Sequence, residues 1–272
     1  MKNKIDIIIP YWGEFSLLKQ AVDSVLEQTS DAWHLTILDD HYPDETAKNY
    51  YSKINDKRIT YIRHRKNIGI TNNFNYAIKH ASAPFCVIMG CDDKLLPNYV
   101  ETALKNINEA DFYQPGVQVI DAKSNVYLPL VDKIKRLLHP KKSCVLAGEK
   151  LATSLCYGNW LYFPSIVWRT STLKKYSFDP RYKILQDVII ELTMIIDGAS
   201  LCFDSTETFQ YRRFADSLSS KEKSKNGIRF NEEKEVYNNF ANKFKDINWK
   251  KASFAAKTRI TSRAHGLLSK FW

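Results

Sequence analysis

The sequence of 272 residues contains no run that approaches the ~20 apolar residues needed for a membrane-spanning helix. Its first apolar segment, residues 5–9, is stopped by Pro10 and is too short for the core of a signal peptide. We therefore expect a cytoplasmic protein. A peripheral contact with the cytoplasmic face of a membrane is compatible with this expectation.

Paired cysteines of the CxxC type are also missing, and the five cysteines are scattered along the chain. This pattern argues against a disulfide framework and against a cysteine-rich zinc site. The sequence further lacks GxxxxGKS or GxxxxGKT, a GxGxxG after its first apolar run, HExxH and GxSxG. P-loop NTPases, dinucleotide-dependent dehydrogenases, zinc proteases and α/β-hydrolases therefore lose their main support.

Acidic residues are fewer than basic ones, 30 against 40, which gives a formal charge of +10 at pH 7. Such an excess attracts nucleic acids, anionic membranes and phosphorylated substrates alike, so it does not choose among them. With 44% hydrophobic residues, the chain can bury a substantial core. We expect one large domain, alone or with an appendage.

Short β-branched runs alternate with segments of helical periodicity in the first part of the chain. Strands are predicted over residues 5–9, 34–38, 59–62 and 85–89, and helices over 15–28, 44–54 and 72–81. Strict alternation indicates βαβ units, an α/β fold and a mostly parallel sheet. Ligands of such sheets bind at the carboxyl ends of the strands.

Two of these predicted strands run directly into paired carboxylates. Asp39 and Asp40 follow the second strand, and Asp92 and Asp93 follow the fourth. Each pair alone fits a turn, but two pairs at strand ends of one sheet favour a shared site. Carboxylate oxygens suit Mg²⁺ or Mn²⁺ bridged to substrate phosphates. The pattern therefore predicts a nucleotide site with a metal-bound diphosphate.

Several short motifs resemble, in order and spacing, the family 2 glycosyltransferases, which have the GT-A fold. The matching segments are IIIPY at 7–11, SVLEQT at 24–29, ILDD at 37–40, NIG at 67–69 with Asn75, and MGCDD at 89–93. The resemblance is close over residues 5–110 and looser over 155–220. It implies a Rossmann-like αβα sandwich at 1–220, with a nucleotide-sugar half at 1–110 and an acceptor half at 111–220. Residues 221–272 would form a helical, basic C-terminal extension.

The resemblance also implies roles for residues of the donor site. Asp40 matches the residue that hydrogen-bonds the base, and Asp93 matches the residue that binds Mn²⁺ or Mg²⁺. Arg212 and Arg213 become candidates for the diphosphate, because Phe214 stands where the family has histidine. The predicted nucleotide contacts are Pro10, Tyr11, Asp39, Asp40, Asn67 and Asp92, although Asn67 also fits a turn.

On the acceptor side, Asp187 precedes an apolar helical run. An aspartate there fits a helix N-cap, whereas the resemblance identifies it as the catalytic base of an inverting transfer. Trp160 and Tyr162 belong to a segment that resembles the family's strand beside the acceptor cavity, and Gln186 would contact the acceptor or the diphosphate. Between the halves we expect a strand over residues 112–120 and a basic loop over 133–142, either solvated or in contact with a phosphate-bearing substrate.

The resemblance thus implies a metal-dependent, inverting transfer from a UDP-hexose or UDP-N-acetylhexosamine to a glycan or lipid-linked hydroxyl. The setting would be lipopolysaccharide or capsule biosynthesis. A nucleotidyltransferase and a non-catalytic nucleic-acid-binding protein are the alternatives. Residues 10–14 lack the glycine-rich basic loop of the first, and aromatic and basic residues do not interleave as the second requires. Nucleic acid is therefore not expected as a partner, and oligomeric state is not predicted.

The C-terminal tail, residues 247–272, has six basic side chains and no acidic one. Mixed with leucine, phenylalanine and tryptophan, they suit a helix on an anionic membrane surface. The same pattern fits a helix packed on its own domain or in an oligomer. We favour the membrane surface, where a lipid-linked acceptor would be found.

Overall fold

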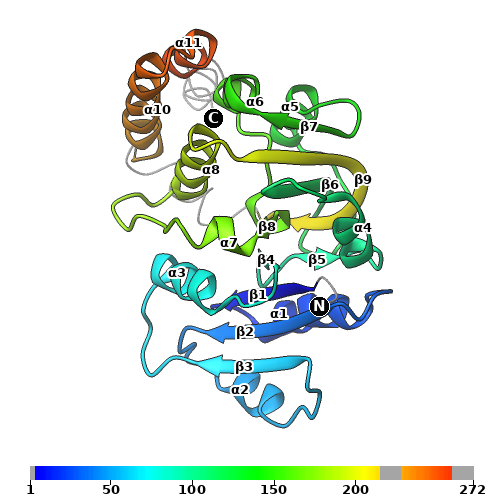
Figure 1. Ribbon diagram of the computed structural model, residues 1–272. Helices are drawn as coiled ribbons and strands as arrows, with labels where there is room; N and C mark the ends of the chain where they lie inside the picture. Colours follow the sequence, from blue (N-terminus) through cyan, green and yellow to red (C-terminus); the bar gives the residue numbers. More distant parts are fainter. Residues whose placement is uncertain (1–3, 215–227, 259–272) are drawn as a thin grey trace.

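The computed structural model describes residues 4–214 and 228–258 (Figure 1). The strands are β1 (Ile5–Tyr11), β2 (Trp33–Asp39), β3 (Ile59–Arg63), β4 (Phe85–Ile88), β5 (Lys94–Leu95), β6 (Phe112–Ile120), β7 (Cys144–Ala147), β8 (Val167–Arg169) and β9 (Ser200–Arg212). The helices are α1 (Phe15–Leu26), α2 (Thr46–Tyr51), α3 (Ile70–His80), α4 (Tyr99–Asn106), α5 (Leu130–Leu138), α6 (Gly148–Tyr157), α7 (Thr170–Leu173), α8 (Gln186–Ile196), α10 (Ile228–Asp246) and α11 (Lys250–Thr258), with a short 3₁₀ turn η1 (Phe163–Ser165).

The strands form one sheet in the order β3-β2-β1-β4-β8-β6-β9-β5, and β7 pairs with β9 beside this path. Strands β3, β2, β1 and β4 are parallel. The α/β fold that the alternation of strands and helices predicts is therefore confirmed. In the other half of the sheet, β8 runs antiparallel to β4 and β6, while β6 and β9 are parallel.

Strand β1 is buried on both faces, which explains its nearly continuous isoleucine run. Ile7 and Ile9 pack into one apolar cluster together with the buried face of α1. Ile8 packs into the other cluster, with Ala77 and Ile78 of α3. Each fully buried isoleucine side chain contributes about 1.5–3 kcal/mol, so these two clusters hold the carboxyl end of β1 in a rigid position.

The expectation of a loop over residues 133–142 is wrong for most of that segment. Helix α5 covers Leu130–Leu138, and Pro140 lies just beyond its end, where proline stops a helix rather than breaking it. Pro129 stands at the N-cap position, which proline tolerates because it lacks only an N–H that a helix start leaves unpaired. The expected strand over residues 112–120 is present as β6.

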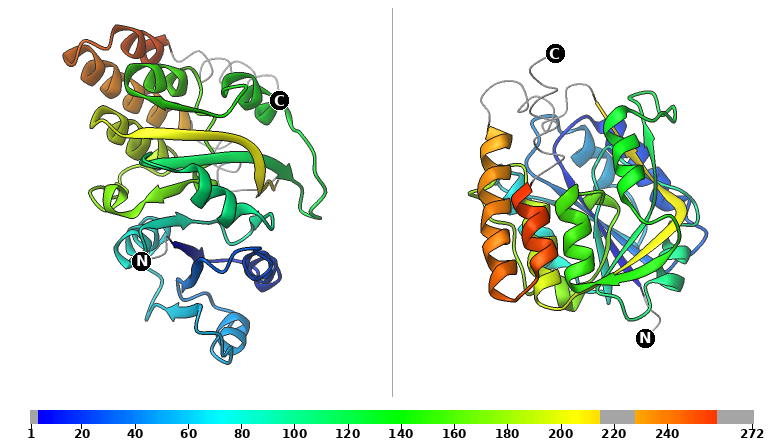
Figure 2. Two further views of the ribbon diagram at one scale, coloured as in Figure 1. Left: turned by 45° about the vertical axis from the view of Figure 1, so that its right-hand side comes forward. Right: turned by 90° about the horizontal axis from the view of Figure 1, so that it is seen from above.

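Helices α10 and α11 pack against α6 and α8, and Figure 2 (right) shows α10, α11 and α6 side by side. Phe240, Phe244 and Ala252 belong to the same buried cluster as α6 and α8. For residues 250–258, the structure therefore shows packing on the chain's own domain. Residues 259–272, with the rest of the basic tail, lie outside the described residues. Within the described part of the chain, no helix is both long and apolar enough to cross a bilayer.

Candidate active site

A pocket of about 420 Å³ lies at the carboxyl ends of β1, β2 and β4. The N-terminal end of α3 and the η1 residues Phe163 and Pro164 complete its wall. This is the position where parallel α/β sheets bind ligands. Five of the predicted donor residues line the pocket, namely Pro10, Tyr11, Asp40, Asn67 and Asp92.

Asp40 is a buried carboxylate that organises the rim of this pocket. Its Oδ1 accepts the N–H of Ile68 at 2.7 Å, and its Oδ2 accepts that of Gly69 at 2.9 Å. Asn67 Oδ1 also accepts the N–H of Gly69, so Asn67 is a turn residue as well as a lining residue. Gly69 has a φ of +82°, which favours glycine there. The base contact of Asp40 stays a prediction.

Asp39 lies behind the pocket wall and is fully buried. Its Oδ1 accepts the N–H of Tyr42 at 2.8 Å, and its Oδ2 accepts the Tyr61 hydroxyl and Arg63 Nη1, the latter at 3.1 Å. Because Asp39, unlike Asp40, does not line the pocket and its oxygens accept bonds from the protein, the structure favours a supporting role for Asp39 over a direct contact with the nucleotide.

Trp12 is a lining residue that the sequence reasoning missed. Its side chain is 49% exposed and meets Tyr42 edge-on, with ring centroids 5.2 Å apart. Tyr11, which the resemblance assigned to the nucleotide, is almost fully buried. Trp12 therefore offers an accessible aromatic surface at the pocket, and its position directly after the predicted Pro10 and Tyr11 was the available signal.

The turn after β4 brings the two carboxylates of Asp92 and Asp93 over Gly90. A Cβ atom at Gly90 would lie 2.5 Å from Asp93 Oδ2 and 3.0 Å from Asp92 Oδ1, so a larger residue there would have to displace the carboxylates. Burial raises the pKa of both carboxyl groups, and the charge of Asp92 raises that of Asp93 further. Such an arrangement is stabilised by a cation.

This pair of carboxylates fits a Mg²⁺ or Mn²⁺ ion. Such ions use one or two protein carboxylates and complete their shell with water and substrate phosphates. Within residues 4–214 and 228–258, no group of three or more His, Cys, Asp or Glu side chains that could hold a metal ion is found. Asp92 lines the pocket, while Asp93 lies behind it. Metal binding by Asp93 stays a prediction.

Arg212 is buried and forms hydrogen bonds with the turn that carries Asp92 and Asp93. Its Nε donates to the Asp92 carbonyl at 2.7 Å, its Nη1 to the Asp121 carbonyl at 2.9 Å, and its Nη2 to Gln20 Oε1 at 2.9 Å. Its backbone N–H also donates to Asp93 Oδ1 at 2.8 Å. Every guanidinium nitrogen is thus engaged with the protein, and a contact of Arg212 with a diphosphate stays a prediction.

Arg213 forms a two-pronged ion pair with the fully buried Asp132, with N···O distances of 2.5 and 2.8 Å. The Tyr162 hydroxyl donates to the same carboxylate at 2.6 Å. These bonds tie the end of β9 to α5. The structure therefore places Arg213 in an internal ion pair, and its contact with a diphosphate stays a prediction.

Asp187 lies in the first turn of α8, one turn before the buried Glu191. Burial raises the pKa of Asp187, and the charge of Lys135 partly offsets this rise. Burial and the charge of Asp187 raise the pKa of Glu191, whose Oε2 accepts from Asn159 Nδ2 at 2.9 Å. A carboxylate with a raised pKa is suited to accept a proton near neutral pH.

The start of α8 is held from two sides. Gln186 Nε2 donates to Thr71 Oγ1 at 2.9 Å, which joins α8 to α3. The carboxylate of Glu232 on α10 accepts the N–H groups of Lys183, Ile184 and Leu185 at 2.8, 2.9 and 3.3 Å. Sequence reasoning missed Glu232, because nothing in a charged helix marks one glutamate as a backbone anchor.

Trp160 and Tyr162, the remaining expected acceptor contacts, line a second pocket in the acceptor half. Trp160 is buried and its Nε1 donates to Ser154 Oγ at 3.0 Å. Gln186 and Asp187 line neither of the two pockets.

Residues 6–170 match glycosyl transferase family 2. The putative colanic acid biosynthesis glycosyl transferase WcaA of Escherichia coli K12 is 28% identical over 208 residues, which cover 72% of this chain and 68% of WcaA. An uncharacterized glycosyltransferase of Rickettsia typhi is 27% identical over 191 residues, or 67% of this chain and 56% of that protein.

Among solved structures, TarS of S. aureus in complex with UDP-GlcNAc is similar, with a TM-score of 0.68 and 16% sequence identity. The match covers 88% of this chain and 65% of that chain. A TarS complex with UDP has a TM-score of 0.59 and 15% identity, over 78% of this chain and 61% of the other. At these identities, the likeness establishes a shared fold. The chain spans only part of the length of these relatives.

Proposed function

The chain belongs to glycosyltransferase family 2, and we propose that it transfers a sugar from a UDP-sugar, with inversion, to a hydroxyl of a glycan or lipid-linked acceptor. Membership makes transfer from a nucleotide sugar the reaction class, in place of the nucleotidyltransferase and nucleic-acid-binding alternatives. The observation that carries the proposal is the pocket at the ends of β1, β2 and β4, with Asp40 and Asp92 in its wall.

Two features support a uridine nucleotide in this pocket. TarS, which shares the fold, binds UDP-GlcNAc and UDP. A carboxylate at the position of Asp40 accepts a hydrogen bond from the N–H that uracil carries in its ring, and the exposed face of Trp12 suits stacking against a base.

A divalent metal on Asp93 and Asp92 would stabilise the negative charge that develops on the departing diphosphate. Gly90 and Arg212 keep these two carboxylates together, Gly90 by leaving space and Arg212 by its bonds to the turn. Burial of the carboxylate pair supports the metal dependence, because two adjacent buried charges are costly without a cation.

Asp187 would act as the base. Its carboxylate takes the proton of the acceptor hydroxyl while the hydroxyl oxygen forms a bond to the anomeric carbon. The bond between that carbon and the phosphate oxygen breaks, and UDP leaves from the opposite face, so the configuration inverts. Lys135 favours the ionised form of Asp187, and Gln186 ties the helix start to the donor half.

We place the reaction in surface-polysaccharide synthesis at a membrane surface. The similarity to WcaA, a putative colanic acid biosynthesis glycosyl transferase, supports the product class. Helix α5 supports the membrane contact: Leu130 and Leu137 are 65% and 75% exposed, and Lys133 and Arg136 are exposed on the same helix. Exposed leucines flanked by cations suit an anionic interface.

Thermal unfolding in the presence of UDP, GDP, CDP or dTDP tests the donor assignment, each with Mn²⁺, with Mg²⁺ and with EDTA. A ligand at 100 times its Kd adds about 2.7 kcal/mol, so UDP with metal should raise Tm by about 5–10 °C. Equal stabilisation by UDP in EDTA would contradict the metal site. Stabilisation by GDP but not by UDP would contradict the choice of nucleotide.

A further inference from the structure

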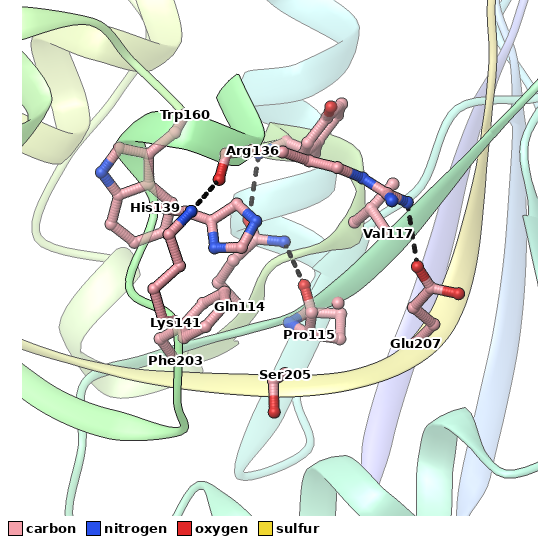
Figure 3. Close-up of a pocket in the computed structure, with 12 residues that line it drawn as sticks. Gln114, Pro115, Val117, Arg136, His139, Lys141, Trp160, Phe203, Ser205 and Glu207 are labelled. Atoms are coloured by element: carbon pink, nitrogen blue, oxygen red, sulfur yellow. Dashed lines mark hydrogen bonds and ion pairs between the residues drawn. The ribbon is translucent and has the colours of Figure 1, made fainter. Parts of the chain in front are cut away.

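A second pocket, of about 320 Å³, lies between the α5 region and strands β6 and β9 (Figure 3). Trp160 and Tyr162 line this pocket, whereas Phe163 and Pro164, which follow directly, line the donor pocket. The segment 160–164 thus forms a wall shared by the two pockets. A molecule in the second pocket lies beside the donor site without entering it.

An irregularity in the sheet shapes the floor of this second pocket. The pairing of β6 with β9 shifts register between Gln114 and Val117. At Gly116, a Cβ atom would lie 2.7 Å from the Ser205 carbonyl oxygen, so only glycine permits this close crossing of the two backbones. Figure 3 shows β9 bending at Ser205 and Glu207, beside the hollow.

The lining of the second pocket is cationic. Arg136, His139 and Lys141 project from the end of α5 and the residues that follow it (Figure 3). Among the described residues that line this pocket, Glu207 is the only acidic one, and it forms an ion pair with Arg136 at 3.0 Å. The Lys141 ammonium donates to the neutral carbonyl of Arg136 at 2.7 Å.

The pKa of His139 depends on the electrostatic potential inside this pocket. Its ring lies 5.2 Å from that of Phe203 and 6.4 Å from that of Trp160, measured between centroids. Burial lowers the pKa of His139, and the positive charges of Lys141 and Arg136 lower it further. A bound anion would offset these positive charges, so its arrival should raise the pKa of His139.

The two pockets have opposite electrostatic character. Glu14, Asp40 and Asp92 line the donor pocket, so it accepts a diphosphate only when a cation is present. The second pocket offers the Lys141 ammonium and the partly buried ring of Tyr162, over a base formed by the buried rings of Trp160 and Phe203. Aromatic surfaces suit the apolar faces of sugar rings, and arginine suits carboxylate or phosphate.

We propose that this second pocket binds a sugar unit that carries a carboxylate or a phosphate, and that it thereby selects an anionic acceptor glycan. The inference rests on the proposed function for the transfer step, but the binding itself requires neither donor nor metal. Under this proposal, the basic residues at the end of α5 bind the charged group of the acceptor. Trp160 and Tyr162 then contribute to acceptor selection.

Binding to this pocket can be followed through the ring signals of His139 by NMR, assigned with His139→Gln. The probes are glucuronate, glucose 6-phosphate, glucose and inorganic phosphate. We expect both charged sugars to bind and to raise the pKa of His139, while glucose and inorganic phosphate bind at least 10-fold more weakly. Lys141→Ala should weaken binding of the charged sugars about 5- to 10-fold. Lys133→Ala, on the same helix but outside the pocket lining, is the matched control and should leave binding unchanged.

Equal binding of glucose and the charged sugars would overturn the proposal, as would charged-sugar binding that Lys141→Ala leaves intact. Inorganic phosphate binding as tightly as glucose 6-phosphate would show an anion site without sugar recognition and would overturn acceptor selection. Thermal unfolding with UDP and metal is measured in parallel. Loss of the UDP response with retained glucuronate binding contradicts the transfer function alone, and the reverse result contradicts the anionic pocket alone.

Discussion

At the scale of the residue, the glycine in the turn after β4 leaves the space in which two carboxylates come together. Asp92 and Asp93 converge where Gly90 has only a hydrogen. Arg212 holds the same turn by a bond to the Asp92 carbonyl and a bond from its own N–H to Asp93. The geometry of the two carboxylates therefore depends on neighbours that do not themselves bind the donor.

Gly90→Ala should disrupt the metal-dependent step without unfolding the protein. The added methyl group would press on Asp93 Oδ2 and displace the carboxylate pair. A displacement of about 1 Å near a reacting centre lowers rates by about 100-fold, and a comparable loss of kcat is expected. Steady-state kinetics across a Mn²⁺ titration measures the effect. A Gly90→Ala enzyme with normal kcat and metal affinity would contradict this reading.

A second residue-scale prediction concerns Lys135 and the acid side of the pH profile. Burial lowers the pKa of Lys135 to about 8, so the amine is charged at pH 7 and below. That charge lowers the pKa of Asp187, which burial raises. Lys135→Met removes the charge, so the pKa of Asp187 should rise and the acid limb of the kcat–pH profile should move to higher pH. Lys133→Met should leave the limb in place. An unshifted limb in Lys135→Met would argue against Asp187 as the base.

At the scale of the element, α5 is an amphipathic helix with part of its polar side turned inward. Asp132 is fully buried in its ion pair with Arg213, and Lys135 donates to the Leu161 carbonyl at 2.6 Å. Leu130 and Leu137 face outward instead. Because α5 packs on the domain partly through these charged groups, Leu130 and Leu137 remain free to contact another surface.

Replacing Leu130 and Leu137 with serine should weaken binding to anionic vesicles. Each buried leucine contributes about 1.5–3 kcal/mol, so the double variant should lose at least 10-fold in partition coefficient. Cosedimentation with phosphatidylglycerol-containing vesicles measures this, with pure phosphatidylcholine vesicles as the comparison. Leu26→Ser on α1, 41% exposed, is the control. Wild-type binding by the double variant would rule out α5 as the contact.

The second element-scale prediction concerns α10, which reaches the catalytic helix through Glu232. Glu232→Ala removes the acceptor for three N–H groups just before α8, so Asp187 should lose its alignment. We expect kcat to fall about 10- to 100-fold with donor affinity nearly unchanged, and Glu232→Gln to recover part of the loss. Asp246→Asn, exposed on the same helix, is the control. A rise in the KM for the donor at constant kcat would contradict a positioning role.

At the scale of the whole molecule, the N-terminal and C-terminal strands meet in one sheet, and hydrogen bonds made by polar side chains join segments far apart in the sequence. Arg212, at the end of β9, reaches the acidic turn of the donor half and Gln20 on α1. Gln186 reaches Thr71. Because these bonds join segments far apart in sequence, stability and site geometry are coupled.

Arg212→Lys should therefore lower both stability and metal-dependent donor binding. Lysine cannot reach the three directions that the guanidinium fills, and it leaves buried acceptors unpaired. A loss of about 2–3 kcal/mol in the free energy of unfolding is expected from urea titration. Arg181→Lys, on an exposed side chain, should change it little. Unchanged stability in Arg212→Lys would show that these hydrogen bonds contribute nothing.

The sequence by itself determined the parallel half of the sheet, the carboxylates at its strand ends and the family. Alternation and β-branched runs are local signals of burial, and β1, β2 and β4 follow them directly. The positions of Asp40 and Asp92 at the pocket followed from the rule that parallel strands end at one edge.

Only the tertiary structure decided which of these residues line the pocket at the carboxyl ends of β1, β2 and β4. It turned Asp39 and Arg212 toward internal partners, brought Trp12 to the pocket, and placed Glu232 of a distant helix beneath the start of α8. The tertiary structure also showed that most of the basic segment 133–142 belongs to helix α5, with the second pocket beside it. Hydrogen-bond partners and side-chain directions depend on contacts between segments far apart in the chain, and local periodicity carries no record of those contacts.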